Sequence, residues 1–169
     1  MELFDVRLLF SGPLWLAGAT CFWLLAMGFL GLCDASRRTV NLPLSFVMLL
    51  YPLVLFGLGY VGWAELLIGG TLFFALMMLA WNGLVGLGDA LVVPAAVMLF
   101  GVLGLVALCI GLFVAVMHSL MDRRESVPTG NTHVDVVSGF EDWRIPMVAY
   151  VSLPVCLIGV VAAIMVALD

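Results

Sequence analysis

The stretch Leu8–Cys33, LLFSGPLWLAGATCFWLLAMGFLGLC, contains no charged side chain. A membrane-spanning helix needs about 20 predominantly apolar residues, and this stretch exceeds that length. It ends abruptly at the polar segment Asp34–Arg38, DASRR. A cleaved signal peptide would have a shorter apolar region, a basic flank and a small-residue cleavage site, whereas the flank here carries Glu2 and Asp5. The stretch therefore predicts a retained first membrane helix.

The composition extends this conclusion to the whole chain. Hydrophobic residues make up 65% of the 169 residues and charged residues 10%, against about 45–50% and about 25% in soluble domains. A soluble domain of this size could not bury so much apolar surface, and disorder is excluded by the same values. A net charge of −5 without any Lys argues against nucleic-acid binding. We therefore expect an all-α integral membrane protein with a single transmembrane domain over residues 1–169.

The rest of the chain contains five further apolar runs. They are Pro43–Tyr60, Leu66–Trp81, Asp89 to about Phe100, about Leu105 to Met121, and about Ile145 to Leu168. A single helix over Asp89–Met121 would be about 50 Å long, against a hydrocarbon core of about 30 Å, so we divide this run at a turn, Gly101–Gly104. Gly62–Glu65 is a short polar turn with an interfacial aromatic side chain. The sequence therefore predicts about six transmembrane helices.

The arginine residues test this number of helices. With six spans, Arg7 lies on one side of the membrane and the other arginines lie opposite it, namely Arg37, Arg38, Arg123, Arg124 and Arg144. With a single helix over Asp89–Met121, Arg123, Arg124 and Arg144 would lie on the opposite side from Arg37 and Arg38. Lys and Arg concentrate in cytoplasmic loops. We therefore expect a multi-pass protein of the cytoplasmic membrane whose polar loop, residues 122–143, faces the cytoplasm.

Two aspartates, Asp34 and Asp89, each adjoin a long apolar run. Between them lie 54 residues, positions 35 to 88, which is enough for two spans and short loops. Two crossings return the chain to the same face, so both carboxyls lie at the cytoplasmic boundary. Such a pair shares one proton and can hydrolyse a peptide, with one carboxyl as general base and the other as general acid. The alternative is that each Asp caps a helix or pairs with a nearby Arg, as Asp34 could with Arg37 or Arg38.

Three glycines precede the second aspartate at positions where a helix would otherwise continue, namely Gly83, Gly86 and Gly88. Glycine permits positive φ and lets another backbone approach closely. Unwound backbone at membrane depth is tolerated only where it lines a wet cavity or is buried in protein, and a peptidase needs such a place to bind an unwound substrate. The alternative is close helix packing through small residues.

These residues resemble a known family. Gly86–Asp89 matches the Gly-x-Gly-Asp (GxGD) signature of membrane-embedded aspartyl proteases. Asp34–Asn41, DASRRTVN, is similar to the first catalytic motif of type IV prepilin peptidases and archaeal preflagellin peptidases. In that motif an Asp ends the first helix, an Arg follows after four residues (here Arg38) and a β-branched residue after six (here Val40). Arg144–Tyr150, RIPMVAY, resembles the opening of the family's last helix.

The sequence also departs from the family's pattern. Leu91 stands where the family often has Lys, and Asn41 comes one position earlier than the usual Pro-Asn. The presenilin-like branch has a Tyr-Asp pair and a Pro-Ala-Leu motif, neither of which occurs here. The cysteine-rich N-terminal segment that the bacterial branch often carries is also missing, so we expect no methyltransferase activity. A pI of about 4.7 without Lys favours an archaeal source.

The resemblance implies an aspartic endopeptidase that removes the short basic leader of prepilin-like or preflagellin-like precursors at the cytoplasmic membrane face. It implies that Asp34 and Asp89 are catalytic. The supporting residues of the motifs are Gly83, Gly86, Gly88 and Arg38.

Further residues are candidates for binding the basic leader. They are Arg37 and Asn41 beside the first aspartate, and Asp135, Glu141 and Asp142 in the polar loop. Acidic groups near the membrane attract a basic peptide; the alternative is that these acids only solvate the loop.

We expect no cofactor and no metal. His118 and His133 have no Cys or carboxylate at metal-ligand spacing, and the four cysteines form no CxxC pair. The competing hypothesis is a non-catalytic membrane protein, such as a transporter subunit or assembly factor, in which Asp34 and Asp89 are an ion path or a structural pair.

Overall fold

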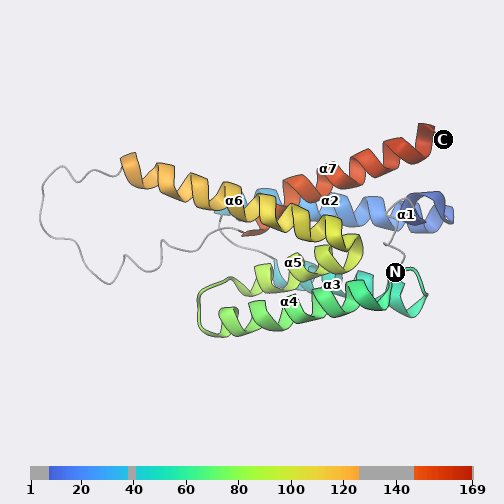
Figure 1. The fold of residues 1–169 in the computed structure, drawn as a ribbon, viewed down its shortest axis with the longest axis horizontal. Helices are drawn as coiled ribbons and strands as arrows, with labels where there is room; N and C mark the ends of the chain where they lie inside the picture. The colour runs from blue at the N-terminus through green and yellow to red at the C-terminus, as the bar shows by residue number, and fades with distance from the viewer. Residues whose placement is uncertain (1–7, 38–40, 126–146, 169) are drawn as a thin grey trace, which may run out of the picture.

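The computed structural model describes residues 8–37, 41–125 and 147–168 (Figure 1). The regular structure in these three ranges is entirely α-helical. The helices are α1 (Leu8–Ser11), α2 (Leu14–Arg37), α3 (Leu42–Gly57), α4 (Trp63–Trp81), α5 (Leu87–Phe100), α6 (Val102–Glu125) and α7 (Met147–Leu168).

The apolar stretch Leu8–Cys33 forms two helices, so the expectation of one uninterrupted helix is wrong. Gly12 and Pro13 separate α1 from α2. Proline has no backbone N–H and its ring disfavours a preceding helical turn, so α2 begins after it. The carbonyl of Pro13 accepts a hydrogen bond from the N–H of Leu16 at 2.8 Å, which starts the second helix.

The next two helices begin at capped positions. Asn41 is the N-cap of α3, and its side-chain oxygen accepts a hydrogen bond from the N–H of Leu44 at 3.2 Å. α4 begins at Trp63 with Gly62 as N-cap, so most of the expected polar turn Gly62–Glu65 is helical. The carboxyl group of Glu65 lies in the first turn of α4, where the helix dipole favours negative charge.

The break expected within Asp89–Met121 is confirmed, but it is shorter than expected. Gly101 has φ 56° and ψ −128°, outside the regions open to residues with a side chain, and α6 begins at the next residue. Gly104 therefore lies inside α6 and not in a turn. A Cβ at Gly104 would lie 2.7 Å from the carbonyl oxygen of Ala96, so this glycine allows α6 to pack closely on α5.

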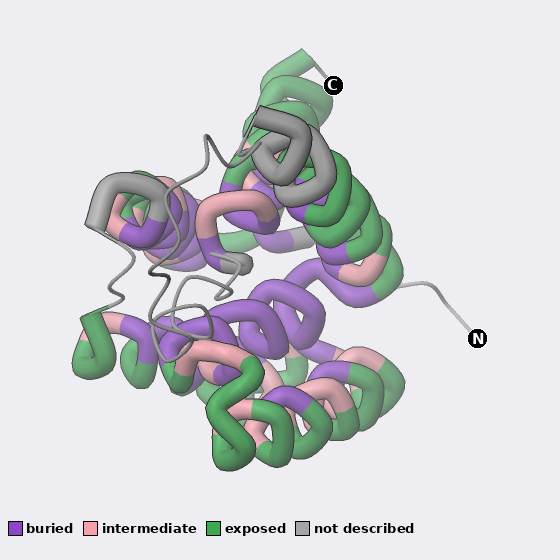
Figure 2. The backbone as a smooth tube through the Cα atoms, turned by 90° about the vertical axis from the view of Figure 1, so that its left-hand side faces the viewer, coloured by how far each residue is buried: buried purple, intermediate pink, exposed green. Residues whose placement is uncertain are grey.

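α5 is the central helix of the bundle. Every residue from Gly88 to Phe100 is buried except Leu91, which is half-buried, and Figure 2 shows this helix as the continuous buried element inside the molecule. α3 and α4 pack against it on one side; α6 and α7 contact it on the other, and α2 lies alongside α7 (Figure 1). The residues that begin α5 are therefore surrounded by several helices.

Three helices of the described residues are long and apolar enough to cross a membrane: Leu14–Asp34, Trp63–Trp81 and Val148–Leu168. Three further helices are apolar but shorter: Leu42–Gly57, Leu87–Phe100 and Val102–His118. The 14 residues of α5 extend only about 21 Å, which is less than the hydrocarbon thickness. The described residues thus form an all-helical membrane protein with three candidate spans, fewer than the six expected.

Large apolar side chains cover the outside of the bundle. Phe22, Phe74 and Phe113 are each about two-thirds or more exposed, at 68%, 72% and 67%. A water-soluble monomer rarely presents so much contiguous apolar surface, whereas lipid covers it without cost. α6 extends to Glu125, so the first residues of the expected loop 122–143 are helical, and the rest of that loop lies outside the described residues.

Candidate active site

The structure brings Asp34 and Asp89 together from helices far apart in the sequence. Asp34 lies in the last turns of α2, and Asp89 lies in the first turn of α5. Their side chains are 4% and 5% exposed, and the backbone N–H groups of two consecutive residues contact one carboxyl each. Two helices, α3 and α4, lie between the two residues as expected, and that both of them cross a membrane stays a prediction.

The N-terminus of α7 contacts both carboxyls. The backbone N–H of Val148 donates to Oδ1 of Asp89 at 3.0 Å, and the N–H of Ala149 donates to Oδ2 of Asp34 at 3.1 Å. The first N–H groups of a helix have no partner inside the helix, and they form the positive end of its dipole. Two consecutive amides of α7 therefore stabilise negative charge on the aspartate pair.

Burial acts against that charge. Two neighbouring carboxylates that are both ionised repel each other, and each loses its hydration. The α7 amides offset this cost for one negative charge better than for two. The physical expectation is a pair that holds one proton between Asp34 and Asp89 and titrates as a unit. Such a pair contains a base and an acid side by side.

Gly86 makes room for one carboxyl of the pair. It is the N-cap of α5, with φ −68° and ψ 143°, an extended conformation that any residue adopts. A Cβ at Gly86 would lie 2.9 Å from Oδ2 of Asp89, closer than real Cβ contacts come. Gly88 is buried in the first turn of α5. The first glycine of the GxGD tetrapeptide therefore acts through the space that it leaves and not through positive φ.

Gly83 has a different role, because its φ of 73° is positive. Its N–H donates to the carbonyl of Ala80 at 3.0 Å, and the N–H of Leu84 donates to the carbonyl of Leu79 at 3.0 Å. These two bonds are the Schellman arrangement that ends a helix. Gly83 thus stops α4, and the chain is unwound between Trp81 and the start of α5, as the glycines predicted.

The other candidate residues are not brought to the pair by any described contact. Asn41 uses its side-chain oxygen to cap α3, and its part in binding a leader stays a prediction. Arg37 is the last residue of α2, but its side chain is outside the described residues. Arg38 and the loop acids Asp135, Glu141 and Asp142 also lie outside them, so the proposed Arg pairing of Asp34 stays untested.

Two contacts near the pair were not anticipated from the sequence. A side chain at Gly31 of α2 would overlap Ser152 of α7, and the Ser152 hydroxyl donates to the carbonyl of Ala149 at 3.1 Å. The Tyr150 hydroxyl and Nδ1 of His118 lie 3.0 Å apart and join α7 to α6. Small residues on one helix face, here Gly28 and Gly31, favour close helix packing; the Tyr150–His118 contact has no signal in the sequence.

Among the described residues, no group of three or more His, Cys, Asp or Glu side chains could hold a metal ion. Metal-independent hydrolysis stays a prediction. The chain matches no protein-family model, no curated protein and no solved structure. The motifs and the geometry of the aspartate pair are therefore the features that indicate a function.

Proposed function

We propose that this protein is a membrane-embedded aspartic endopeptidase in which Asp34 and Asp89 are the catalytic pair. The observation that supports this most directly is the meeting of two buried carboxyls from different helices at the N-terminus of a third helix. Buried carboxyls of this kind are expensive in an apolar setting. A functional site explains why the chain retains two of them.

The pair can perform peptide hydrolysis without any other group. The ionised carboxyl takes a proton from water as the water oxygen bonds to the peptide carbon, while the neutral carboxyl gives its proton to the carbonyl oxygen. The tetrahedral intermediate then loses a hydroxyl proton to the newly ionised carboxyl. The other carboxyl protonates the leaving nitrogen, and the C–N bond breaks. The pair ends with one proton, as it began.

The proposed substrate is a prepilin-like or preflagellin-like precursor with a short basic leader. This follows from the resemblance of Asp34–Asn41 and Gly86–Asp89 to the two motifs of those peptidases. The proposal places the pair at the cytoplasmic face of the cytoplasmic membrane, in a chain that crosses it six times. In that arrangement α2 to α7 are the crossings, and α5, the shortest of them, is enclosed by its neighbours.

A structural pair is the second candidate function. The hydrogen bonds from Val148 and Ala149 favour it, because capping the N-terminus of α7 is by itself a sufficient use for a carboxylate. In that case Asp34 and Asp89 would hold α7 in place and react with nothing. The two candidates differ in what the loss of a carboxyl does to turnover.

The test uses the purified full chain in detergent with a synthetic precursor, a Lys/Arg leader joined to an apolar helix. We expect the wild-type chain to cleave it, and both Asp34→Asn and Asp89→Asn to lose activity by about 10²–10⁴-fold. Glu65→Gln is the matched control, because Glu65 lies near Gly101 at the opposite end of α5. Near-normal cleavage by either Asn variant, with folding intact, would leave the structural pair as the explanation.

A further inference from the structure

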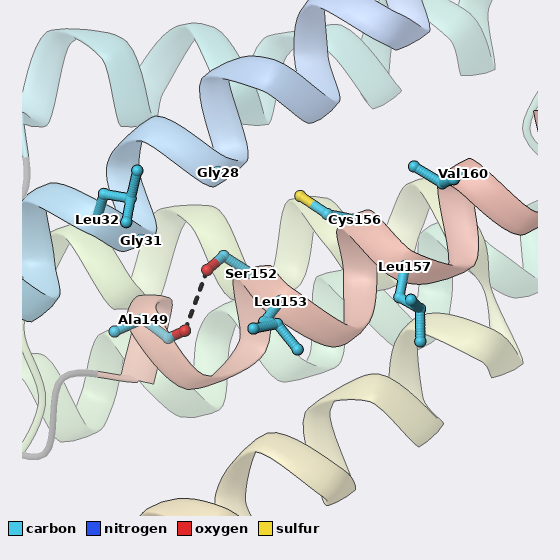
Figure 3. A pocket seen from close by; sticks show the side chains of 9 residues that line it. All are labelled: Gly28, Gly31, Leu32, Ala149, Ser152, Leu153, Cys156, Leu157 and Val160. Atoms are coloured by element: carbon cyan, nitrogen blue, oxygen red, sulfur yellow. Dashed lines mark hydrogen bonds between the residues drawn. The ribbon is translucent and has the colours of Figure 1, made fainter.

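α2 and α7 form an open groove on the outside of the bundle, with a volume of about 500 Å³ (Figure 3). We name it the α2–α7 groove. Gly28 and Gly31 contribute small surfaces from α2, and Leu32, Leu153 and Leu157 border it as exposed apolar side chains. The last three are 72%, 73% and 62% exposed, so nothing in the described chain covers them.

The groove results from the two glycines of α2. A Cβ at Gly31 would overlap Ser152, so α2 and α7 touch there. One turn further, a Cβ at Gly28 would lie 3.7 Å from Sγ of Cys156, an ordinary contact distance that leaves a shallow surface. Small residues of this kind allow close approach of a second helix in a membrane. The leucines beside them provide the apolar contacts that such a helix would make.

One end of the groove, at Ala149, adjoins the aspartate pair. Ala149 lines the groove, and its N–H donates to Oδ2 of Asp34. From Ala149 the groove follows α7 to Val160, about 16 Å along the helix, or roughly half of the hydrocarbon core. A helix lying in the groove would thus deliver its end to Asp34.

We propose that the α2–α7 groove binds the apolar helix that follows the scissile bond of the precursor. This inference rests on the proposed endopeptidase function and adds the surface that holds the membrane part of the substrate. The leader and the scissile bond are unwound at Asp34 and Asp89, while the helix after them packs on Gly28 and on the exposed leucines. Binding energy from this remote helix then positions the bond that is cut.

Filling the groove tests the inference. Leu157→Trp enlarges an exposed groove side chain, and Gly28→Leu occupies the shallow surface. Val161→Trp is the matched control, because Val161 is 49% exposed on the same helix but does not line the groove. The probes are a precursor with a Lys/Arg leader and a 20-residue Leu/Ala helix, and a short peptide with the same leader and scissile bond but no helix.

We expect both groove variants to raise KM for the helix-bearing precursor by about tenfold or more and to cleave the short peptide like the wild type. Val161→Trp should cleave both probes normally. Normal cleavage of the helix-bearing precursor by the groove variants would overturn the groove while the endopeptidase stands. A wild-type chain that cleaves neither probe would overturn the proposed function itself.

A binding experiment is independent of turnover. Cys156 lines the groove, so an Asp89→Asn chain that keeps only this cysteine can be oxidised with copper–phenanthroline beside a precursor that carries one cysteine in its apolar helix. A disulfide between Cys156 and the precursor supports the groove. A disulfide between two copies of the chain, or none at all because lipid fills the groove, would overturn it.

Discussion

Two regions of the molecule support the aspartate pair in different ways. The compact half is α5 with the helices that enclose it, and the open half is α2 with α7 and the groove between them. Asp89 begins α5, which is buried by its neighbours along almost its whole length. Asp34 lies in the last turn of α2, which packs mainly on α7 beside an open groove. An amide of α7 binds each carboxyl, but the helix that carries Asp89 is enclosed by the core, whereas the helix that carries Asp34 borders the groove. In the proposed function, the compact half provides rigidity and the groove provides access from the membrane.

The largest expected effect concerns the pair that joins the halves. Below the lower limb of its titration both carboxyls are protonated and no base remains; above the upper limb both are ionised and no acid remains. Activity should therefore follow a bell-shaped pH profile, falling about tenfold per pH unit on each side. The limbs belong to the pair and not to either residue. Rates of precursor cleavage between pH 3 and pH 10 check this, and a flat profile would contradict a shared proton.

The next effect separates Gly83 from Gly86, two of the three glycines that precede Asp89. Gly86→Ala should lower kcat by about tenfold, because the new Cβ would displace the Asp89 carboxyl from its bond to Val148. Gly83→Ala should leave kcat unchanged and reduce stability by about 1 kcal/mol, because alanine is strained at positive φ. Kinetics and thermal unfolding of both variants test the distinction. Equal kcat values would show that Gly86 is not needed for the geometry of the pair.

A third effect tests the compact half alone. Gly101→Ala should destabilise the protein by about 1–3 kcal/mol, because φ 56° with ψ −128° is closed to alanine. Its Cβ would also lie 3.1 Å from Cγ of Glu65. Gly101 is at the far end of α5 from Asp89, so the kcat of the folded fraction should stay normal. Thermal unfolding together with active-site titration measures both; an unchanged melting temperature would contradict the strain.

These comparisons also show what the sequence can predict. Apolar runs located α3 to α7 within a few residues, and two of these helices, α3 and α4, lie between Asp34 and Asp89 as expected. That both aspartates lie at one membrane boundary stays a prediction. The break at Gly12–Pro13 was visible in the sequence but was outweighed by the length of the apolar run. The donors from α7 could not be predicted, because every residue except proline has a backbone N–H and only the packing of α7 selects Val148 and Ala149.

The number of spans was the weaker part of that prediction. Hydropathy measures how apolar a segment is but not how it is buried. α5 is as apolar as a membrane helix, yet it is short and enclosed by its neighbours. Its length is limited by Gly101, whose backbone angles end the helix. The mean hydropathy of a segment does not contain that information.

The smallest effect concerns the open half. The Tyr150–His118 hydrogen bond lies one residue after Ala149 and joins α6 to the first turn of α7. Tyr150→Phe removes this bond at a cost of about 0.5–1 kcal/mol and should also lower kcat about two- to threefold, because α7 positions the amide that binds Asp34.

The matched control is Tyr51→Phe, which removes the 2.8 Å bond between Tyr51 and Thr20. Thr20 is 14 residues before Asp34, about 21 Å along α2, so this variant should lose similar stability with an unchanged kcat. Steady-state kinetics and thermal unfolding of the two variants decide the point. If both variants lowered kcat equally, the loss would reflect general loosening of the bundle, and the position of α7 would have no special part in holding the pair.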